Sequence, residues 1–534
     1  MNYSQMANIV IFFLFVIMLC GFCCLPLNAI EVNQRWEQPL ISTQEYHNPY
    51  KDVVLSVTYK GPNDKTMNTY GFWDGGNTFK IRCAFPTAGT WTWTTSCSDR
   101  SNSGLHHKKG SVKVTAYVGS NPIYKHGFLK VSRDHHYLAY KDDTPFLWMG
   151  DTAWIAPLKA SATDWQTYVN DRVKKHFSVI QISPASAWSG RTTDTTGNTP
   201  FIGAGITQWN PAYWQGFEEK VEYANRKGLT ILLVGIMCPV DHSSTSADAQ
   251  LFARNIVARL YGNQVIFAPS FDRPYSTLGD EVGNAINAAT SIHLITQHPN
   301  TPYHPSKNTT AEAYYDKSYL DFSANQSGHN GVDLSWCHWK AIFWNLSLYN
   351  RSPDKPVINA EAIYDGYARG GKTATAYDAR AMGYLSWLSG SMGYTYGKQG
   401  LFNWETDGWK SASQQPSSTQ MKYLYDFFNA IEWWRLLPAH DKIMNQSSDN
   451  LTMMAFAETA KGDFGVAYLP DNRSIKIDMS SFSSPVEGEW YNPTTGSYSA
   501  IRGRMENSGM HLFWTPAQGD WVLLLNVAQQ ESKK

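Results

Sequence analysis

The chain has 534 residues, more than one ordinary domain holds, and its length suggests about three domains. Lys plus Arg equals Asp plus Glu at 45 each, and no basic run is interleaved with aromatic residues, so nucleic acid is not an expected partner. Aromatic residues make up 14% of the chain and charged residues only 17%. Aromatic rings stack on the C–H faces of sugars but also fill β-rich cores, so the composition is compatible with a carbohydrate ligand without requiring one.

An apolar run from Ile9 to Leu25 opens the chain and is followed by PLNA. This pattern predicts a secretory signal peptide over residues 1–29 and a secreted, periplasmic or cell-surface location. The residues before the run contain no Lys or Arg, and the run is long, so an uncleaved membrane anchor is the alternative.

The cysteines downstream of this segment lack the C-x-x-C spacing of a structural zinc site. Cys83 and Cys97 flank a predicted hairpin and could form a disulfide after export. No metal and no cofactor is expected. The four cysteines are Cys83, Cys97, Cys238 and Cys337.

Residues 31–118 contain short alternating runs, such as VVLSVTY and FKIRCAF, separated by turn residues. That pattern predicts an Ig-like β-sandwich. A similar pattern returns over residues 439–528 and predicts a second, smaller β-sandwich.

Residues 122–438, between the two sandwiches, alternate apolar runs with amphipathic helical patterns. One predicted helix begins with Asn210 as N-cap and Pro211 at its first position, and ends at Gly228. The alternation predicts an α/β fold, a (β/α)8 TIM-type barrel of parallel strands; an open doubly wound sheet is the alternative, but GDTAW is not its glycine-rich phosphate turn. The eight strands are expected at 146–154, 178–185, 229–237, 265–272, 293–299, 320–328, 356–364 and 392–397.

Two acidic residues stand at ends of these strands, Asp272 closing the fourth and Glu361 in the seventh. The carboxyl ends of barrel strands converge on one face, and glycoside hydrolysis needs a carboxyl pair there. We therefore expect Asp272 to be the acid/base and Glu361 the nucleophile of a retaining mechanism. The alternative for either residue is a salt-bridged or helix-capping acid. Asp280 and Glu281 rank lower because they open a predicted helix.

Other polar and aromatic residues at strand ends are expected to bind substrate at the same mouth. Trp404, in GLFNWETDGW, is expected to form an aromatic wall or else to be a packed loop residue. The remaining predicted substrate-binding residues are Asp151, Trp154, Gln181, His298, Gln326, His329, Tyr364, Tyr394 and Tyr396.

The segment GYARGGKT, from Gly366 to Thr373, matches the G-x-x-x-x-G-K-[ST] spacing of a nucleotide-binding loop. It follows the seventh strand of a chain predicted to be exported, where ATP is scarce. We therefore expect a flexible loop beside the site and no nucleotide.

Several of these segments together resemble the apiosidase-like glycoside hydrolases of the DUF4038 group: FLWMGDTAW, VIFAPSFDRP, LDFSANQSGH, PVINAEAIYDG and GYLSWLSGSMGYTYG. The N-terminal sandwich is similar to the DUF5060 module, and the C-terminal one to a β domain described as collagen-binding. The resemblance implies a hydrolase barrel with an acid/base Asp after strand four and a nucleophile Glu on strand seven, which are Asp272 and Glu361 here.

The chain departs from that family beside both acids. Ser270 and Phe271 stand where the family usually has Gly-Gly, and Ala360 and Ala362 flank Glu361 where it has Gly and Pro. The best-known members imply release of apiose from pectic side chains, and these altered neighbours predict a pocket that differs from theirs.

The expected function is a secreted glycoside hydrolase acting on O-glycosidic bonds of a plant-type polysaccharide or oligosaccharide. An endo-β-glucanase-like hydrolase and a non-catalytic carbohydrate-binding surface protein are the alternatives.

Overall fold

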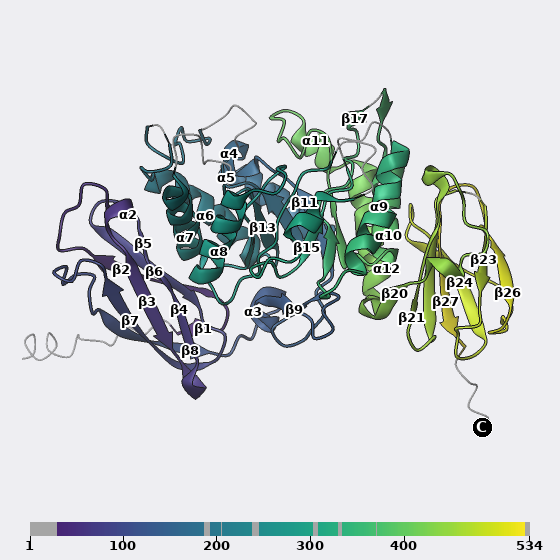
Figure 1. Ribbon diagram of the computed structural model, residues 1–534, viewed down its shortest axis with the longest axis horizontal. Coiled ribbons are helices and arrows are strands. Elements are labelled where there is room, and N and C mark those ends of the chain that lie inside the picture. The colour runs from purple at the N-terminus through teal and green to yellow at the C-terminus, as the bar shows by residue number, and fades with distance from the viewer. Residues whose placement is uncertain are drawn as a thin grey trace, which may run out of the picture.

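A computed structural model describes residues 29–185, 193–203, 205–237, 245–302, 308–328, 334–369, 371–471 and 473–528. Three parts follow one another along the long axis of the molecule, a β-rich part, an α/β part with a curled parallel sheet and a second β-rich part (Figure 1). The predicted signal peptide lies outside the described residues except for Ala29. Within the ranges that are described, no helix has the length and apolar character needed to cross a bilayer.

The N-terminal part consists of two facing sheets, which agrees with the predicted sandwich, and also carries the short helix α2 (Pro49–Asp52). Its strands alternate buried and exposed side chains, as in the pattern of β7. The five-stranded sheet has the order β1 (Ile30–Glu31), β8 (Lys109–Thr115), β7 (Gly89–Cys97), β3 (Leu55–Lys60), β4 (Thr66–Tyr70), and the other has the order β2 (Arg35–Ile41), β6 (Thr78–Ala84), β5 (Phe72–Trp73).

The suggested disulfide between Cys83 and Cys97 is absent: both thiols are buried and free. Cys83 is on β6 and Cys97 on β7, and these strands belong to the two opposite sheets. Facing sheets lie about 10 Å apart, whereas a disulfide needs Cα atoms within about 7 Å, so the sandwich architecture does not favour the bond.

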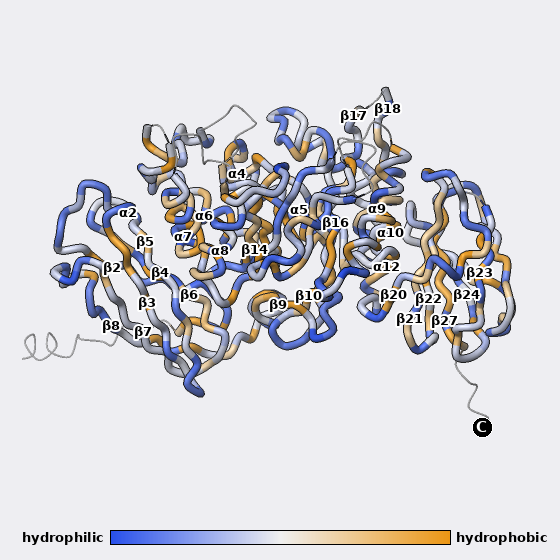
Figure 2. The backbone as a smooth tube through the Cα atoms, in the orientation of Figure 1, coloured by the Kyte–Doolittle hydropathy of each residue, from blue (hydrophilic) through white to orange (hydrophobic). Residues whose placement is uncertain are grey.

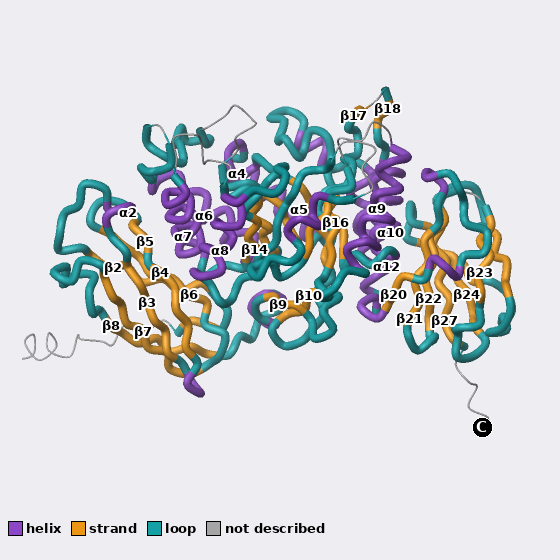
Figure 3. Tube along the Cα trace, in the orientation of Figure 1, coloured by secondary structure: helices purple, strands orange, loops and turns teal. Residues whose placement is uncertain are grey.

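The central part is built around a curled parallel sheet whose strands lie within a layer of helices (Figure 3). Its strand order is β14 (Val265–Ala268), β13 (Thr230–Val234), β12 (Val179–Ile182), β11 (Trp148–Thr152), β19 (Gly393–Tyr396), β16 (Val357–Asn359), β15 (Ser323–Asn325). In terms of the predicted strands this order is 4-3-2-1-8-7-6. Seven of the eight predicted strands therefore form one curled parallel sheet, with the neighbours that the prediction gave them.

The predicted fifth strand, residues 293–299, is an extended segment next to β14 that has no regular ladder. Phe267 on β14 accepts from Thr296 N at 2.9 Å and donates to Leu294 O at 3.0 Å. On the other side, the Asp321 carboxylate accepts from Ile295 N at 2.7 Å in place of a backbone carbonyl. This side-chain contact interrupts strand pairing and leaves the parallel sheet with seven regular strands.

Helices cover the outside of the sheet, and apolar residues concentrate along the strands (Figure 2). As predicted, α6 begins with Asn210 capping Ala212 N and with Pro211 at its first position, and Gly228 follows its end with φ +87°. The helices are α4 (Ala156–Lys159), α5 (Ala162–Lys174), α6 (Pro211–Arg226), α7 (Ser246–Leu260), α8 (Thr277–Ala289), α9 (Leu334–Tyr349), α10 (Ala376–Leu388), α11 (Trp409–Ser413) and α12 (Pro416–Asn429).

A small cap under the barrel joins it to the N-terminal sandwich, formed by α3 (Pro122–His126), β9 (Leu129–Val131) and β10 (Leu138–Tyr140) (Figure 1). The sandwich is further fixed by buried ion pairs to the barrel helices: Arg82 to Glu218 at 2.7 Å and Arg259 to Asp74 at 2.6 Å. Truncating one member would leave its partner as an uncompensated buried charge, so these pairs hold the two parts in one arrangement.

The C-terminal part begins at Leu436, because β20 already pairs with β21. Arg380 on α10 binds Asp520 through two N–H groups, at 2.8 and 2.6 Å, and ties this part to the barrel. One sheet has the order β20 (Leu436–Pro438), β21 (Ala455–Thr459), β22 (Phe464–Leu469), β27 (Trp521–Val527), β24 (Val486–Asn492), β25 (Ser497–Ala500), and the other pairs β23 (Ser474–Asp478) with β26 (Met510–Trp514).

Candidate active site

Asp272 lies four residues beyond the end of β14 and points into the mouth formed by the carboxyl ends of the strands. Its backbone is left-handed, with φ 49°, a conformation that Asp tolerates better than most residues. Its N–H donates to His298 O at 3.1 Å, which fixes this turn to the predicted fifth strand. The side chain remains 52% exposed, so Asp272 is accessible to a ligand.

Ser270 strengthens the same connection. Its hydroxyl donates to Gln297 Oε1 at 2.5 Å and accepts from His298 N at 3.2 Å. A glycine, which the family usually has here, could make neither contact. The substitution therefore ties the turn that carries Asp272 to the segment that carries His298.

Glu361 lies just past the end of β16 and is almost completely buried, with 3% exposure. Gly328 N donates to Glu361 O at 2.9 Å, and a Cβ at Gly328 would lie 2.3 Å from the carbonyl carbon of Ala362. Only glycine fits so close to this backbone. Across the barrel, Gln181 Nε2 donates to Ala360 O at 3.2 Å, so the chain on both sides of Glu361 is held.

Gln326 connects the two carboxyl groups. Its Nε2 donates to Asp272 Oδ1 at 2.9 Å and to Glu361 Oε2 at 2.7 Å, which uses both N–H bonds of the amide. Tyr364 donates its hydroxyl to the other oxygen, Glu361 Oε1, and accepts from Trp154 Nε1 at 2.9 Å. Each Glu361 oxygen thus has a donor.

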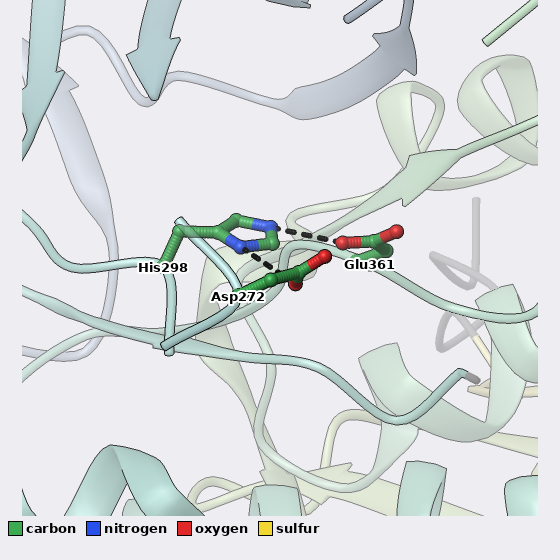
Figure 4. A group of neighbouring side chains, drawn as sticks. All are labelled: Asp272, His298 and Glu361. Carbon is green, nitrogen blue, oxygen red and sulfur yellow. Dashed lines mark ion pairs between the residues drawn. The ribbon is translucent and has the colours of Figure 1, made fainter. Parts of the chain in front are cut away.

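His298 is buried and turns one ring nitrogen toward each of the two acids (Figure 4). Its Nε2 is 3.3 Å from Glu361 Oε2, and its Nδ1 is 3.9 Å from Asp272 Oδ1. Trp154 and Phe271 meet the imidazole edge-on, with ring centroids at 5.2 and 5.6 Å. These contacts hold the imidazole in place, and 1% of His298 is exposed.

Two effects raise the pKa of Asp272 to about 8: burial of the carboxyl is the larger, and the negative charge of Glu361 adds to it. The hydrogen bond from Gln326 acts in the opposite direction. Because about half of the side chain meets solvent, water moderates the shift, but its direction favours a neutral Asp272 at physiological pH.

One group of described residues has the spacing of a metal site. It consists of Asp272, His298 and Glu361, and one ligand atom of each lies within 4.8 Å of the others. Carboxylate and imidazole are ligands for divalent ions. However, His298 turns different ring nitrogens to the two acids, and one ion can bind only one of them. The arrangement fits an imidazole between two acids better than a shared ion.

The structure gathers five of the predicted substrate-binding residues around the two acids: Trp154, Gln181, His298, Gln326 and Tyr364. His329 lies outside the described residues. Four others do not reach the mouth, and all are buried: Asp151, Tyr394, Tyr396 and Trp404.

Three of those four are strand residues whose side chains face the helix layer. Asp151 binds Arg172 at 3.1 Å and accepts from Tyr168 at 2.6 Å, both on α5. The Tyr396 hydroxyl is 2.6 Å from Ser417 Oγ on α12, and Tyr394 lies against Gly383 on α10.

The fourth residue, Trp404, stacks on Trp409 at 4.4 Å and packs edge-on against Tyr168. It is a packed loop tryptophan, one of the two expected possibilities, and not an exposed aromatic wall.

Two aromatic residues near the site were not among the predicted contacts. Phe271 packs on Trp154 at 4.4 Å, and Phe402 packs on Tyr364 at 4.7 Å. Phe271 stood out in the sequence as a departure from the family pattern. Phe402 lies in a loop after β19, where no periodic pattern marks it.

The GYARGGKT segment does not have the backbone structure of a nucleotide-binding loop. Its described residues make a short antiparallel hairpin, β17 (Ala368–Arg369) with β18 (Lys372–Thr373), which protrudes at the top of Figure 1. A phosphate-binding loop would instead lead from a strand directly into a helix N-terminus. The helix α10 begins only after Thr375.

Sequence comparison matches residues 132–435 to the apiosidase-like catalytic domain. Residues 30–98 match a domain of unknown function, DUF5060, and residues 437–526 match a putative collagen-binding domain of a collagenase. No match was found among curated proteins.

Two solved structures share the fold of most of the chain. A glycoside hydrolase is 23% identical, covers 78% of this chain and 100% of its own, and superposes with a TM-score of 0.69. A family 5 glycoside hydrolase from Bacteroides vulgatus is 21% identical, with coverage of 77% and 96% and a TM-score of 0.68. The catalytic-domain match spans more than half of the 534 residues, and the chain is a glycoside hydrolase of the apiosidase-like family.

Proposed function

We propose that this glycoside hydrolase cleaves O-glycosidic bonds of plant-type polysaccharides or oligosaccharides with retention of configuration, using Asp272 as acid/base and Glu361 as nucleophile. The main support is the distance between the two acids: one carboxylate oxygen of Asp272 lies within 4.8 Å of one of Glu361. Retaining pairs stand about 5 to 5.5 Å apart, and inverting pairs about 6.5 to 9.5 Å. The short spacing is closer to that of retaining pairs than to the wider spacing that accommodates a water molecule beside the general base, and so favours retention.

The surroundings of the acids support a different role for each. Gln326 occupies Asp272 Oδ1, which leaves Oδ2 to carry the proton, and the raised pKa keeps that proton near neutral pH. Glu361 is held by donors on both oxygens and cannot rotate freely. A neutral acid beside a fixed carboxylate is the combination that double displacement needs.

In the first step the Asp272 proton passes to the glycosidic oxygen, the bond from that oxygen to the anomeric carbon breaks, and a Glu361 oxygen bonds to that carbon. In the second step a water molecule gives a proton to the Asp272 carboxylate, its oxygen bonds to the anomeric carbon, and Glu361 leaves as a carboxylate. Both acids then return to their starting protonation states.

Apiose on pectic side chains is the first substrate to test, because the catalytic-domain match is to apiosidase-like proteins. Ser270, Phe271, Ala360 and Ala362 alter the residues around both acids, so a different sugar is the second possibility. An endo-β-glucanase-like hydrolase remains the alternative within the enzyme class. It would release oligomers where an exo-acting apiosidase releases monosaccharide.

A panel of pectic and hemicellulosic oligosaccharides, with products separated by chromatography and the first anomer identified by NMR, tests this function. We expect one sugar class to be cleaved with retention, and Asp272→Asn and Glu361→Gln to abolish most cleavage while remaining folded. An inverted product would exclude the proposed roles. Sugar binding without turnover of any linkage would favour the non-catalytic surface protein.

Two further proposals concern the chain as a whole. We propose that residues 293–299 complete an eight-stranded barrel, supported by their hydrogen bonds to β14 and to Asp321.

We also propose export, supported by the apolar run from Ile9 to Leu25. Exported protein whose N-terminus is Ile30 would agree with cleavage after Ala29, and retention in the membrane fraction would favour the uncleaved anchor.

A further inference from the structure

A cavity lined by neither Asp272 nor Glu361 lies where the N-terminal sandwich, the cap and the central part meet. Its volume is about 640 Å³, within the range of small-ligand sites. The central part contributes Asn287 near the end of α8, residues 290–294, which lead from α8 into the fifth segment, and Asp321 just before β15. These residues lie at the amino ends of the strands, whereas Asp272 and Glu361 lie at the carboxyl ends.

The cavity carries uncompensated positive charge. Lys65 from the sandwich and Lys125 and Lys141 from the cap region line it, and no ion pair among the described residues includes any of the three. A fourth lining lysine, Lys130, pairs with Asp143 at 2.5 Å. Burial lowers the pKa of Lys65, and the charge of Lys141 lowers it further, so these two ammonium groups are close enough to repel each other. An anion between them would relieve that repulsion.

The acidic residues of the lining are already engaged. Asp142 binds His126 at 2.7 Å and accepts from Thr144 N at 3.1 Å. Asp321 accepts from Ile295 N at 2.7 Å, and burial raises its pKa to about 6. Neither is paired with a lysine of the cavity, and the site keeps its excess of positive charge.

The rest of the lining is of mixed character. Met67, Phe128 and Ile292 supply apolar surface, and Asn287, Thr290 and Ser291 supply polar side chains. A simple inorganic anion would use the lysines alone. A sugar that carries a carboxylate would also place its C–H face on the apolar wall and its hydroxyls near the polar side chains.

We propose that this cavity is a secondary binding site for an acidic oligosaccharide, bound through its carboxylates by Lys65 and Lys141. The choice of a sugar rests on the proposed function of the barrel, whereas the choice of an anion rests on the lysines. Such a site would hold an acidic region of a polysaccharide on the enzyme while another region reaches the catalytic mouth.

Calorimetric titration of the full-length protein with tetragalacturonate tests the proposal, in a Glu361→Gln background that prevents hydrolysis. We compare two double variants in this background. The first is Lys65→Gln/Lys141→Gln, and the control is Lys113→Gln/Lys476→Gln. The control pair removes the same charge from exposed positions on the two sandwiches, outside the cavity. We expect at least a tenfold loss of affinity for the first pair and no change for the second.

Two further titrants separate the possible ligands. A neutral tetrasaccharide should bind at least tenfold more weakly than tetragalacturonate, and the tetragalacturonate affinity should fall as salt rises from 50 to 300 mM. Inorganic phosphate binding as tightly, with the same dependence on the lysines, would overturn the sugar assignment. Affinity unchanged in the Lys65/Lys141 pair would overturn the site.

The proposal and the proposed function can fail independently. The wild-type protein could hydrolyse no glycoside while the Lys65→Gln/Lys141→Gln variant loses affinity for tetragalacturonate. In that case the proposed glycosidase function is wrong and the cavity assignment stands. If hydrolysis is normal and the lysine pair binds as wild type, the cavity assignment alone is wrong.

Discussion

The two strand ends that carry the proposed catalytic acids are built in different ways. Asp272 sits on a left-handed turn, half exposed, held mainly through its backbone and through Ser270. Glu361 is buried, with a donor on each oxygen and its backbone fixed from two sides. A group that must exchange protons with substrate and water benefits from access, whereas a nucleophile benefits from a fixed position.

The largest expected effect comes from removing the fixed carboxylate. Glu361→Gln keeps the size and shape of the side chain but removes the nucleophile, so we expect kcat to fall by about 10⁴-fold or more. Steady-state assays on the best substrate of the panel measure this, with circular dichroism to confirm folding. A loss below tenfold would mean that another group attacks the sugar.

The accessible acid should show an effect that depends on the leaving group. Asp272→Asn should lower kcat/KM by about 10² to 10⁴-fold on a natural glycoside, whose leaving oxygen must be protonated. The loss should be much smaller on a dinitrophenyl glycoside of the same sugar, because that leaving group departs unprotonated. Equal losses on both substrates would show that Asp272 does not act as the acid.

The pH profile follows from the raised pKa of Asp272. The acid must be protonated to act, so activity should be present below pH 8 and fall about tenfold per unit above it. The measurement is kcat/KM between pH 4 and 10. An alkaline limb centred near pH 4 to 5 would show an Asp with an ordinary pKa and contradict the assignment.

Gln326 contacts both acids and should have an intermediate effect. Gln326→Leu removes a donor from Glu361, and we expect a loss of about 10 to 10²-fold in kcat. Because the same amide lowers the pKa of Asp272, its loss should also move the alkaline limb to higher pH. A limb that moves to lower pH would show that Gln326 does not stabilise the ionised acid.

Residues that face away from the mouth should show the smallest effect. Tyr396→Phe removes one buried hydrogen bond to Ser417, which costs about 1 kcal/mol of unfolding free energy, and should leave kcat and KM within about twofold of wild type. Chemical denaturation and steady-state kinetics check the two parts. A large rise in KM would show that Tyr396 contacts substrate after all.

Much of the fold follows from the alternation of apolar runs and helices, which identified seven strands in the observed order. The fifth strand was less predictable, because the Asp321 side chain replaces a backbone partner there. Such a contact joins residues 26 positions apart and leaves no local pattern.

The strand pattern predicted that the two acids and five of the other candidate residues would lie together, as they do, but not which face of each strand points inward. A strand of a parallel barrel is buried on both sides, so its apolar pattern does not distinguish the lumen from the helix layer. Asp151, Tyr394 and Tyr396 therefore looked like site residues although they face helices.

The division of roles between Asp272 and Glu361 is tested most directly by trapping the covalent intermediate. Asp272→Asn is mixed with the dinitrophenyl glycoside of the preferred sugar, quenched within seconds, digested and analysed by mass spectrometry. We predict one added glycosyl group on the peptide that contains Glu361. A glycosyl group on any other residue, or an inverted sugar product with no adduct, would contradict the account.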